Sequence, residues 1–349
     1  SLFFLGLFLY STEKFKKPYI LITLMALLIL DLYFAHANYY HKEEFKQIQE
    51  TGENAKFILS DPEVFRIYVT AETSKKTREF KKNGKKLDFR KEKFMLGLLG
   101  NQRILNIDGI GVTQQQRWKD FTHLIKTAPE VDNTNLLNML NVKYVVSIPA
   151  ITSPNYELVH SHEPIPQDPK EREEFEESAT LKIYKNKTSL AHAFLVPQCR
   201  VLNTAREYKE TFERKDFNPE QILLLDAEPK NFPCSEEKGS EKKGSVQIDS
   251  YQSNTLDISV NLPSRQFLFL SDSYFPGWKA YVDGKEREIL RANYLFRAVI
   301  IEPGEHKVHF SYEPFSFKLG LAISLTTLLI CGVFCWRNKT RKIIPDTQQ

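Results

Sequence analysis

The sequence predicts a membrane protein fragment in which transmembrane α-helices flank a large extracytoplasmic α+β region, and this region ends in a β-sandwich module of a jelly-roll-like kind. Three observations predict this fold class. Strongly apolar segments lie near both ends of the chain, basic residues flank them, and short strand-like segments follow one another closely between residues 245 and 312. The averages of 42% hydrophobic and 26% charged residues are ordinary for a folded protein. They conceal the concentration of apolar residues in segments near the two ends of the chain.

Three apolar segments are candidate membrane helices. A helix crosses the bilayer core with roughly 20 apolar residues. Residues 19–36 and 315–336 are therefore expected to span the membrane, whereas 1–10 is half a span and is expected to be a truncated helix. A secretory signal peptide would carry its basic stretch before the apolar run, but here that stretch comes after it. Because Ser1 lies inside an apolar run, we expect the C-terminal piece of a longer polytopic protein.

The distribution of positive charge predicts the orientation. Residues 11–18 form a short lysine-rich loop, and the tail 337–349 carries basic residues directly after the last apolar segment. The positive-inside rule places both on the cytoplasmic side, so residues 37–314 are expected outside the cytoplasm. Cys199 and Cys234 fall in this external part, where a disulfide could persist, although their spacing leaves open whether they are bonded.

Residues 37–234 are expected to form an extracytoplasmic α+β domain. Segment 56–70 reads as two strands joined by an Asp-Pro turn. Segments 113–125 and 133–141 have helical spacing. Further strands are expected within 142–149, 180–196 and 221–226.

Two charged stretches interrupt this domain. Residues 74–94 hold ten basic and three acidic side chains, which indicates either a solvated loop or a patch that meets anionic lipid headgroups or a lipid-linked phosphate. Residues 163–178 are acidic and broken by prolines, which is typical of a solvated loop. The charges nearly cancel in a net charge of +4, and nothing in the sequence indicates a nucleic acid partner.

The final third is expected to be a separate module. Residues 235–244 contain no apolar side chain and are taken as a linker between domains. Residues 245–314 then hold short strands in close succession with glycine and proline turns, which predicts the β-sandwich. The alternation of apolar and polar residues is plainest at 305–312.

A hairpin is predicted within the module, where Asp283 and Gly284 form the dipeptide that a two-residue type I′ turn favours. Trp278 is then expected to pack on the sheet and Gly277 to turn the chain. Tyr274 precedes that turn and is freer to contact a ligand. The pairs expected across the hairpin are Val282 with Lys285, Ala280 with Arg287, Lys279 with Glu288 and Trp278 with Ile289.

Signatures of known chemistry are mostly missing. The sequence has no glycine-rich phosphate loop and no cysteine or histidine cluster with zinc spacing, so no cofactor or metal is identified. His160 and His162 would share a face of a strand, which is the minimum for two metal ligands but lacks a third. Asp31 lies in the second apolar segment, either as a functional intramembrane carboxylate or close enough to the outer end to reach the interface.

Residues 271–325 resemble the C-terminal signature of the bacterial YfhO-like membrane proteins, which are regarded as glycosyltransferases of the GT-C type. Weaker resemblance extends upstream through "FRIYV", "LLNMLNVKYVV" and "LKIYKNKTSLAHAFLV". The last of these departs from the family form at Lys185 and at Ala191-His192. The residues that carry the resemblance are Pro276, Gly277, Trp278, Asp283, Gly284, Arg291, Asn293, Arg297, Gly304, Tyr312 and Pro314.

The resemblance implies an enzyme of the bacterial cytoplasmic membrane that transfers a sugar from a polyprenyl-phosphate donor to a glycan or glycolipid acceptor of the cell envelope. In that family the catalytic acid lies in an early external loop, so no catalytic residue is assigned here and the fragment alone is expected to be inactive. The alternative is a non-catalytic, membrane-anchored carbohydrate-binding or scaffold protein. The candidate acceptor-binding residues are Asp272, Tyr274, Phe275, Arg291, Asn293 and Arg297, and the structural ones are Gly277, Trp278, Asp283 and Gly284.

Overall fold

The computed structural model describes residues 52–82, 105–107, 115–127, 135–162, 180–214, 216–230, 232–234 and 244–341, together with isolated helical positions at 25, 26, 29, 30 and 33. The chain divides into two compact units, 1–51 and 52–349. The predictions for segment 1–10, most of segment 19–36 with Asp31, the acidic stretch 163–178 and the tail beyond 341 fall outside the described residues. The same holds for nearly all of the linker 235–244.

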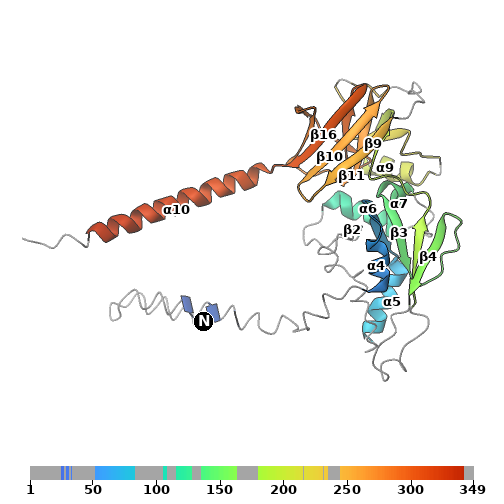
Figure 1. Ribbon diagram of the computed structural model, residues 1–349, viewed down its shortest axis with the longest axis horizontal. Helices are drawn as coiled ribbons and strands as arrows, with labels where there is room; N and C mark the ends of the chain where they lie inside the picture. Colours follow the sequence, from blue (N-terminus) through green and yellow to red (C-terminus); the bar gives the residue numbers. More distant parts are fainter. Residues whose placement is uncertain are drawn as a thin grey trace, which may run out of the picture. The chain divides into compact units, whose positions relative to one another are not determined.

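A mixed sheet with the strand order β2-β1-β3-β5-β4 forms the first part of the second unit. In it β1 runs parallel to β2 and β3, whereas β5 is antiparallel to both β3 and β4. Its strands are β1 (Arg66–Val69), β2 (Leu105–Asn106), β3 (Val142–Ser147), β4 (Tyr156–His162) and β5 (Leu181–Asn186). The helices around it are α4 (Glu53–Leu59), α5 (Ala71–Lys82), α6 (Gln116–Thr127) and α7 (Asn135–Met139) (Figure 1).

Two of the local predictions in this part are wrong. The first of the two strands expected in 56–70 is helix α4, because Ala55 and Ile58 recur at helical spacing and are both buried in the core beside β1 and β3. The basic stretch is helical as far as Lys82 in α5, where a loop was one expectation. The helices expected near 116 and 136 and the strands expected near 142, 181 and 222 are confirmed.

The remaining strands form two sheets that face each other, as the sandwich prediction requires. One has the order β13-β12-β16-β10-β9 and the other the order β6-β11-β15-β14-β8-β7. The five-stranded sheet consists of β9 (Ser245–Tyr251), β10 (Thr255–Leu262), β12 (Trp278–Val282), β13 (Lys285–Arg287) and β16 (Gly304–Tyr312). The six-stranded sheet consists of β6 (Ala193–Val196), β7 (Gln198–Val201), β8 (Ile222–Leu225), β11 (Gln266–Ser273), β14 (Leu290–Ala292) and β15 (Phe296–Ile301).

The sandwich is larger than the predicted module 245–314. Strands β6, β7 and β8 precede the predicted linker 235–244 and yet lie in the same sheet as β11, so strands on both sides of the linker share one sheet. Helix α9 (Ala205–Phe212) connects β7 to β8, which run parallel. The physical reason is backbone pairing, because β11 pairs with β15 along one edge and needs β6 to satisfy its backbone groups along the other.

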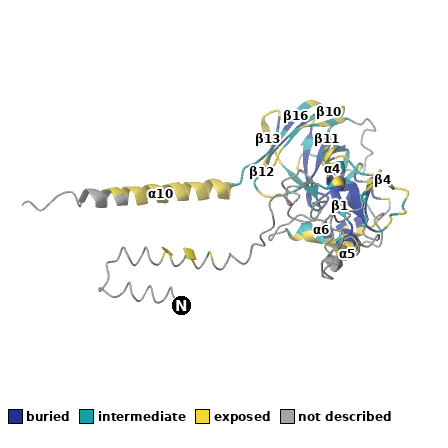
Figure 2. Cartoon of the chain, turned by 60° about the horizontal axis from the view of Figure 1, so that its bottom comes forward, coloured by how far each residue is buried: buried dark blue, intermediate teal, exposed yellow. Residues whose placement is uncertain are grey.

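Each face of the six-stranded sheet has its own core. Leu268 and Leu270 of β11 pack with Val308 and Phe310 of β16 between the two sheets. On the opposite face, the odd-numbered phenylalanines of β11 pack into a second core that includes Phe121 of α6. Figure 2 shows the buried residues of β11 between exposed outer surfaces. β11 therefore reads as a continuous apolar run because it has no solvent-facing side.

The predicted hairpin is confirmed at its turn. Asp283 and Gly284 have φ values of 50° and 78°, as a type I′ turn needs. Val282 pairs with Lys285 and Ala280 with Arg287, as predicted. Strand β13 ends at Arg287, so the last two expected pairs lie beyond the ladder, and Lys279 instead forms an ion pair with Glu286, 3.2 Å from Nζ to Oε2.

Helix α10 (Phe315–Arg341) follows β16 directly. Residues 315–333 have a mean hydropathy of 1.8 and are wholly exposed, so this helix is long and apolar enough to cross a membrane. It is the one helix of that kind among the residues that the structure describes. The several flanking spans expected from the sequence are not shown.

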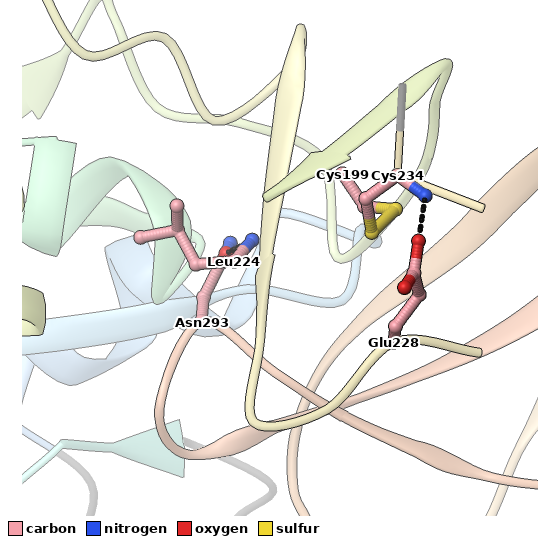
Figure 3. The surroundings of a disulfide bond; sticks show 5 residues. All are labelled: Cys199, Leu224, Glu228, Cys234 and Asn293. Carbon is pink, nitrogen blue, oxygen red and sulfur yellow. Dashed lines mark hydrogen bonds between the residues drawn. A yellow bond between two sulfur atoms is a disulfide. The ribbon is translucent and has the colours of Figure 1, made fainter. Parts of the chain in front are cut away.

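A disulfide joins Cys199 to Cys234, which settles the question that their spacing left open (Figure 3). Cys199 lies in β7, at the edge of the six-stranded sheet. The backbone N–H of Cys234 donates to Oε1 of Glu228 at 3.1 Å, so the segment after β8 is closed on itself at the point where the disulfide joins it to β7. The closed loop of 35 residues lowers the entropy of the unfolded chain by an amount equivalent to roughly 3–4 kcal/mol.

Candidate functional site

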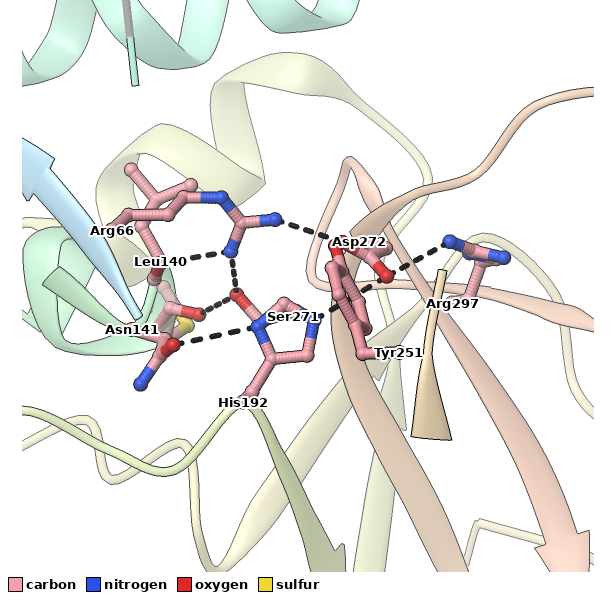
Figure 4. A network of polar contacts seen from close by, with 9 residues as sticks. Arg66, Leu140, Asn141, His192, Tyr251, Ser271, Asp272 and Arg297 are labelled. Carbon is pink, nitrogen blue, oxygen red and sulfur yellow. Dashed lines mark hydrogen bonds and ion pairs between the residues drawn. The ribbon is translucent and has the colours of Figure 1, made fainter. Parts of the chain in front are cut away.

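A buried cluster of charges surrounds Asp272 where the three sheets meet (Figure 4). Asp272 lies at a bulge in β11, between the pairs Leu270 with Arg297 and Ser273 with Phe296, and the bulge turns its carboxylate away from the regular strand. Arg66, the first residue of β1, places Nη2 2.8 Å from Oδ1 of Asp272. Arg297 of β15 places Nη2 3.1 Å from Oδ2.

Neutral side chains complete this cluster. The hydroxyl of Tyr251, at the end of β9, donates to Oδ1 of Asp272 at 3.2 Å. Nε2 of His192, which precedes β6, lies 3.3 Å from Oδ2. Arg66 also donates to the hydroxyl of Ser271 and to the carbonyl of Leu140, each at 3.0 Å. The carboxylate thus links β1 of the first sheet to both layers of the sandwich.

Burial and charge act in opposite directions on these groups. Burial disfavours ionisation of Asp272, but His192 and the two guanidinium groups outweigh it and hold the carboxyl pKa well below its usual range. Burial lowers the pKa of His192, and Arg66 and Arg297 add to that effect, while Asp272 opposes it. We therefore treat Asp272 as ionised and His192 as neutral near pH 7.

His192 predicts a dependence of stability on pH. Its folded-state pKa lies below the unfolded value of about 6.5, so the unfolded chain binds the extra proton as the pH falls. The free energy of unfolding should be undiminished above about pH 6.5 and should decrease below it, by up to about 1.4 kcal/mol per pH unit. His192→Gln should remove this part of the slope in urea titrations between pH 7 and pH 5. An identical slope in the variant would contradict the assignment.

A second cluster, which we call the arginine shelf, consists of Arg117, Asp226 and Arg291 with Tyr274 and Tyr294. Nη1 of Arg117, on α6, lies 2.9 Å from Oδ1 of Asp226, which follows β8. Nη1 of Arg291, on β14, lies 3.2 Å from Oδ2 of the same carboxylate. The guanidinium groups also lie over aromatic rings, Arg117 over Tyr294 at 4.7 Å and Arg291 over Tyr274 at 4.5 Å.

The shelf differs from the buried cluster in its access to solvent. The side chains of Arg117, Asp226 and Arg291 are 33%, 31% and 35% exposed, so a ligand can reach them. Burial and the acceptor Asp120 raise the pKa of Tyr294 to about 12, so this phenol stays protonated. The shelf presents fixed guanidinium donors beside a carboxylate acceptor and aromatic rings, a combination that can bind the hydroxyl groups of a polar ligand.

The six candidate acceptor-binding residues separate into two groups. Tyr274 and Arg291 belong to the shelf, and Phe275 is 46% exposed beside it. Asp272 and Arg297 belong to the buried cluster. Asn293 is also buried.

The buried members of that list act in the fold. Asn293 has a φ of 43° in the turn between β14 and β15, and its Oδ1 accepts from the N–H of Leu224 at 2.9 Å. Arg297 is 3% exposed, with its guanidinium 4.1 Å from the ring of Trp278. Direct contact with an acceptor is therefore retained as a hypothesis for Tyr274, Phe275 and Arg291 alone.

The four residues that the sequence analysis assigned to structural roles lie at turns or pack on the core. Gly277 has a φ of 102° and faces Pro314 so closely that an added Cβ would lie 3.1 Å from its Cα. Trp278 packs on the core between the two sheets. Asp283 and Gly284 form the turn described above.

Several members of both clusters could not be recognised as site residues from the sequence. Arg66, His192 and Tyr251 contact Asp272 from positions at least 21 residues away, and Arg117 reaches Asp226 across 109 residues. A charged residue at the start of an apolar strand, as in "FRIYV", was the one usable hint for Arg66.

No group of three or more metal-ligating side chains occurs among the described residues. His160, considered above as a ligand, stacks on Phe57 at 4.7 Å between ring centroids.

Comparisons with known proteins match the final third of the chain. The family model described as "Bacterial membrane protein YfhO" matches residues 235–324. The "Uncharacterized protein YfhO" of Bacillus subtilis (strain 168) is 30% identical over 94 residues, which are 27% of this chain and 11% of that protein. The match thus spans about a tenth of the curated relative. No solved structure matches.

Proposed function

Residues 235–324 identify this chain as a YfhO-like bacterial membrane protein, and from that premise we propose that it is the C-terminal part of a polytopic glycosyltransferase of the GT-C type. The proposed reaction moves a sugar from a polyprenyl-phosphate donor to a glycan or glycolipid acceptor of the cell envelope. The proposed location is the bacterial cytoplasmic membrane, with residues 37–314 outside the cytoplasm. The arginine shelf contacts the acceptor.

The main support for the proposal is the arrangement of charged and aromatic side chains in the arginine shelf. A sugar offers several hydroxyl groups and an apolar ring face, so proteins bind it with planar charged side chains and aromatic rings. Arg291 is held in place from two sides, by Asp226 at 3.2 Å and by the ring of Tyr274 at 4.5 Å. Such side chains lose little conformational freedom when a ligand binds, which favours affinity.

The disulfide supports the proposed orientation. A bond between Cys199 and Cys234 persists in an oxidising compartment and is rare in the cytoplasm. An external sandwich with α10 as its membrane segment fits both this bond and the basic residues after the span.

The catalytic carboxylate is proposed to lie elsewhere in the whole protein. Of the two buried or half-buried carboxylates described above, Asp272 is fully committed to ion pairs and Asp226 is shared by two arginines. Both carboxylates are thereby engaged by arginine side chains. The described part of the chain then supplies acceptor binding, and the whole protein supplies the chemistry.

The test uses membranes that contain the product of the whole reading frame, undecaprenyl-phosphate glucose, galactose and N-acetylglucosamine with tritium in the sugar, and isolated cell envelopes as acceptor. Tyr274→Ala and Arg291→Ala should each reduce transfer about tenfold at low acceptor concentration, equivalent to about 1.4 kcal/mol of lost binding. Most of the loss should appear as a higher KM for the acceptor, because neither side chain is proposed to take part in bond making.

Lys285→Ala is the matched control, since Lys285 is an exposed cation at the tip of the hairpin, and its transfer rate should equal that of the wild type. If both shelf variants transfer sugar at the wild-type rate, the arginine shelf does not bind the acceptor. A wild-type protein that binds envelope glycan and transfers none of the three sugars would favour the alternative of a carbohydrate-binding or scaffold protein.

A further inference from the structure

An exposed aromatic turn lies at the foot of the membrane helix. Residues 274–277 connect β11 to β12, and Phe275 at the tip of this turn is 46% exposed. Among the described residues from 52 to 314, the other exposed large hydrophobic side chains are Leu59 and Leu158. A single exposed hydrophobic side chain is ordinary, but Phe275 adjoins the exposed apolar start of α10, so the two together form one apolar surface.

The turn is fixed to the start of α10 by backbone contacts. The N–H of Glu313 donates to the carbonyl of Gly277 at 2.6 Å, and Gly277 packs against Pro314, the last residue before the helix. A side chain at position 277 would meet Pro314 and Tyr312, so glycine permits the close approach as well as the positive φ. The ring of Phe275 lies 6.3 Å from that of Tyr312.

These contacts limit the depth at which Phe275 can lie. Phe275 is two residues from Gly277, so their Cα atoms are at most about 7 Å apart. The headgroup layer on each side of a bilayer is itself roughly 5–8 Å thick. Because Pro314 precedes the apolar span 315–333, Phe275 lies within about one headgroup layer of the hydrocarbon boundary. This limit does not depend on the tilt of α10.

The residues around the turn have the composition of a membrane interface. Phe315 and Phe317, in the first turn of α10, are 76% and 68% exposed. Nζ of Lys318 lies 3.2 Å from Oε2 of Glu313, so a charged pair accompanies the aromatic rings. At an interface phenylalanine rings offer apolar surface to the lipid, and a lysine can keep its apolar stem beside them while its charged end stays among the headgroups.

We propose that Phe275 inserts into the lipid interface of the leaflet that the N-terminus of α10 enters, and that the turn 274–277 is a second membrane contact of the sandwich. The occupant of this surface is bilayer lipid. A second contact beside the helix restricts how far the sandwich can tilt relative to the membrane surface. Tyr274 belongs to the arginine shelf, so the shelf is held at the level of the lipid headgroups.

The test measures the depth of spin labels in the full chain, reconstituted into vesicles of phosphatidylethanolamine and phosphatidylglycerol. Phe275→Cys and Leu158→Cys are labelled in a background in which Cys331 and Cys335 are alanine, so the bonded pair is retained. Leu158 is 52% exposed and is the matched control, and Leu319→Cys marks a position inside the span. Collisions with oxygen report lipid, and collisions with a nickel chelate report water.

At Phe275 the ratio of oxygen to nickel collisions should exceed that at Leu158 severalfold and should approach that at Leu319. Equal ratios at Phe275 and Leu158 would overturn the proposal, because both sites would then face water. Low collision rates with both reagents at Phe275, together with dipolar broadening between labels, would also overturn it and would indicate contact with a second copy of the chain. Phe275 is exposed, so its substitution leaves the core intact, and near-ultraviolet circular dichroism verifies this.

Discussion

Asp272→Ala should lower the free energy of unfolding by about 3–5 kcal/mol, the range for removing one partner of a buried ion pair. The substitution leaves Arg66 and Arg297 with 11% and 3% of their side chains exposed and no carboxylate between them. Two desolvated cations then repel each other, and neither can move to solvent without opening a sheet. Urea unfolding of the detergent-solubilised chain, followed by tryptophan fluorescence, measures the change.

Asp257→Ala is the control for this experiment. Asp257 pairs with His309 at 2.7 Å, but the two side chains are 46% and 44% exposed, so the loss should be at most about 1 kcal/mol. An unchanged unfolding midpoint for Asp272→Ala would contradict the structural role of the buried cluster. It would return Asp272 to the list of residues available for acceptor binding.

Trp278→Ala should destabilise the sandwich by about 3 kcal/mol. The indole packs on the core between the two sheets and lies 5.4 Å from the ring of Tyr312. It also covers the guanidinium of Arg297, whose Nε and Nη1 are buried and have no hydrogen bond partner. Loss of the ring therefore removes apolar contacts and a cation–π contact together. The expected loss lies at the lower end of the range for tryptophan, because Trp278 is only half-buried.

Trp278→Phe and Tyr274→Ala separate packing from ligand contact in the same denaturant assay. The phenylalanine retains an aromatic face for Arg297 and should lose about 1 kcal/mol. Tyr274 is half-buried on the shelf, and its removal should change the midpoint little. A wild-type midpoint for Trp278→Ala combined with a loss of transfer would mean that the indole binds a ligand and that its packing contributes nothing.

Features encoded by neighbouring residues were predictable from the sequence. Asp283-Gly284 specified its own turn, because few other residues accept positive φ at two successive positions. The alternation within 305–312 predicted which side of β16 is buried, and the length of the apolar run predicted α10. In each case the deciding interactions are local, or involve only water and lipid, so no knowledge of distant partners was needed.

Tertiary structure alone decided which distant segments meet. Strand β6 joins β11 across the predicted linker because the backbone of β11 needs a hydrogen-bonded neighbour on the edge that β15 leaves open, and no local sequence pattern identifies that neighbour. Arg66 and Asp272 are 206 residues apart, and each alone reads as an ordinary charged residue. They meet because a buried charge must be paired, and only the folded chain brings the opposite charges within reach. The same reasoning holds for Cys199 and Cys234, whose separation in sequence says nothing of their separation in space.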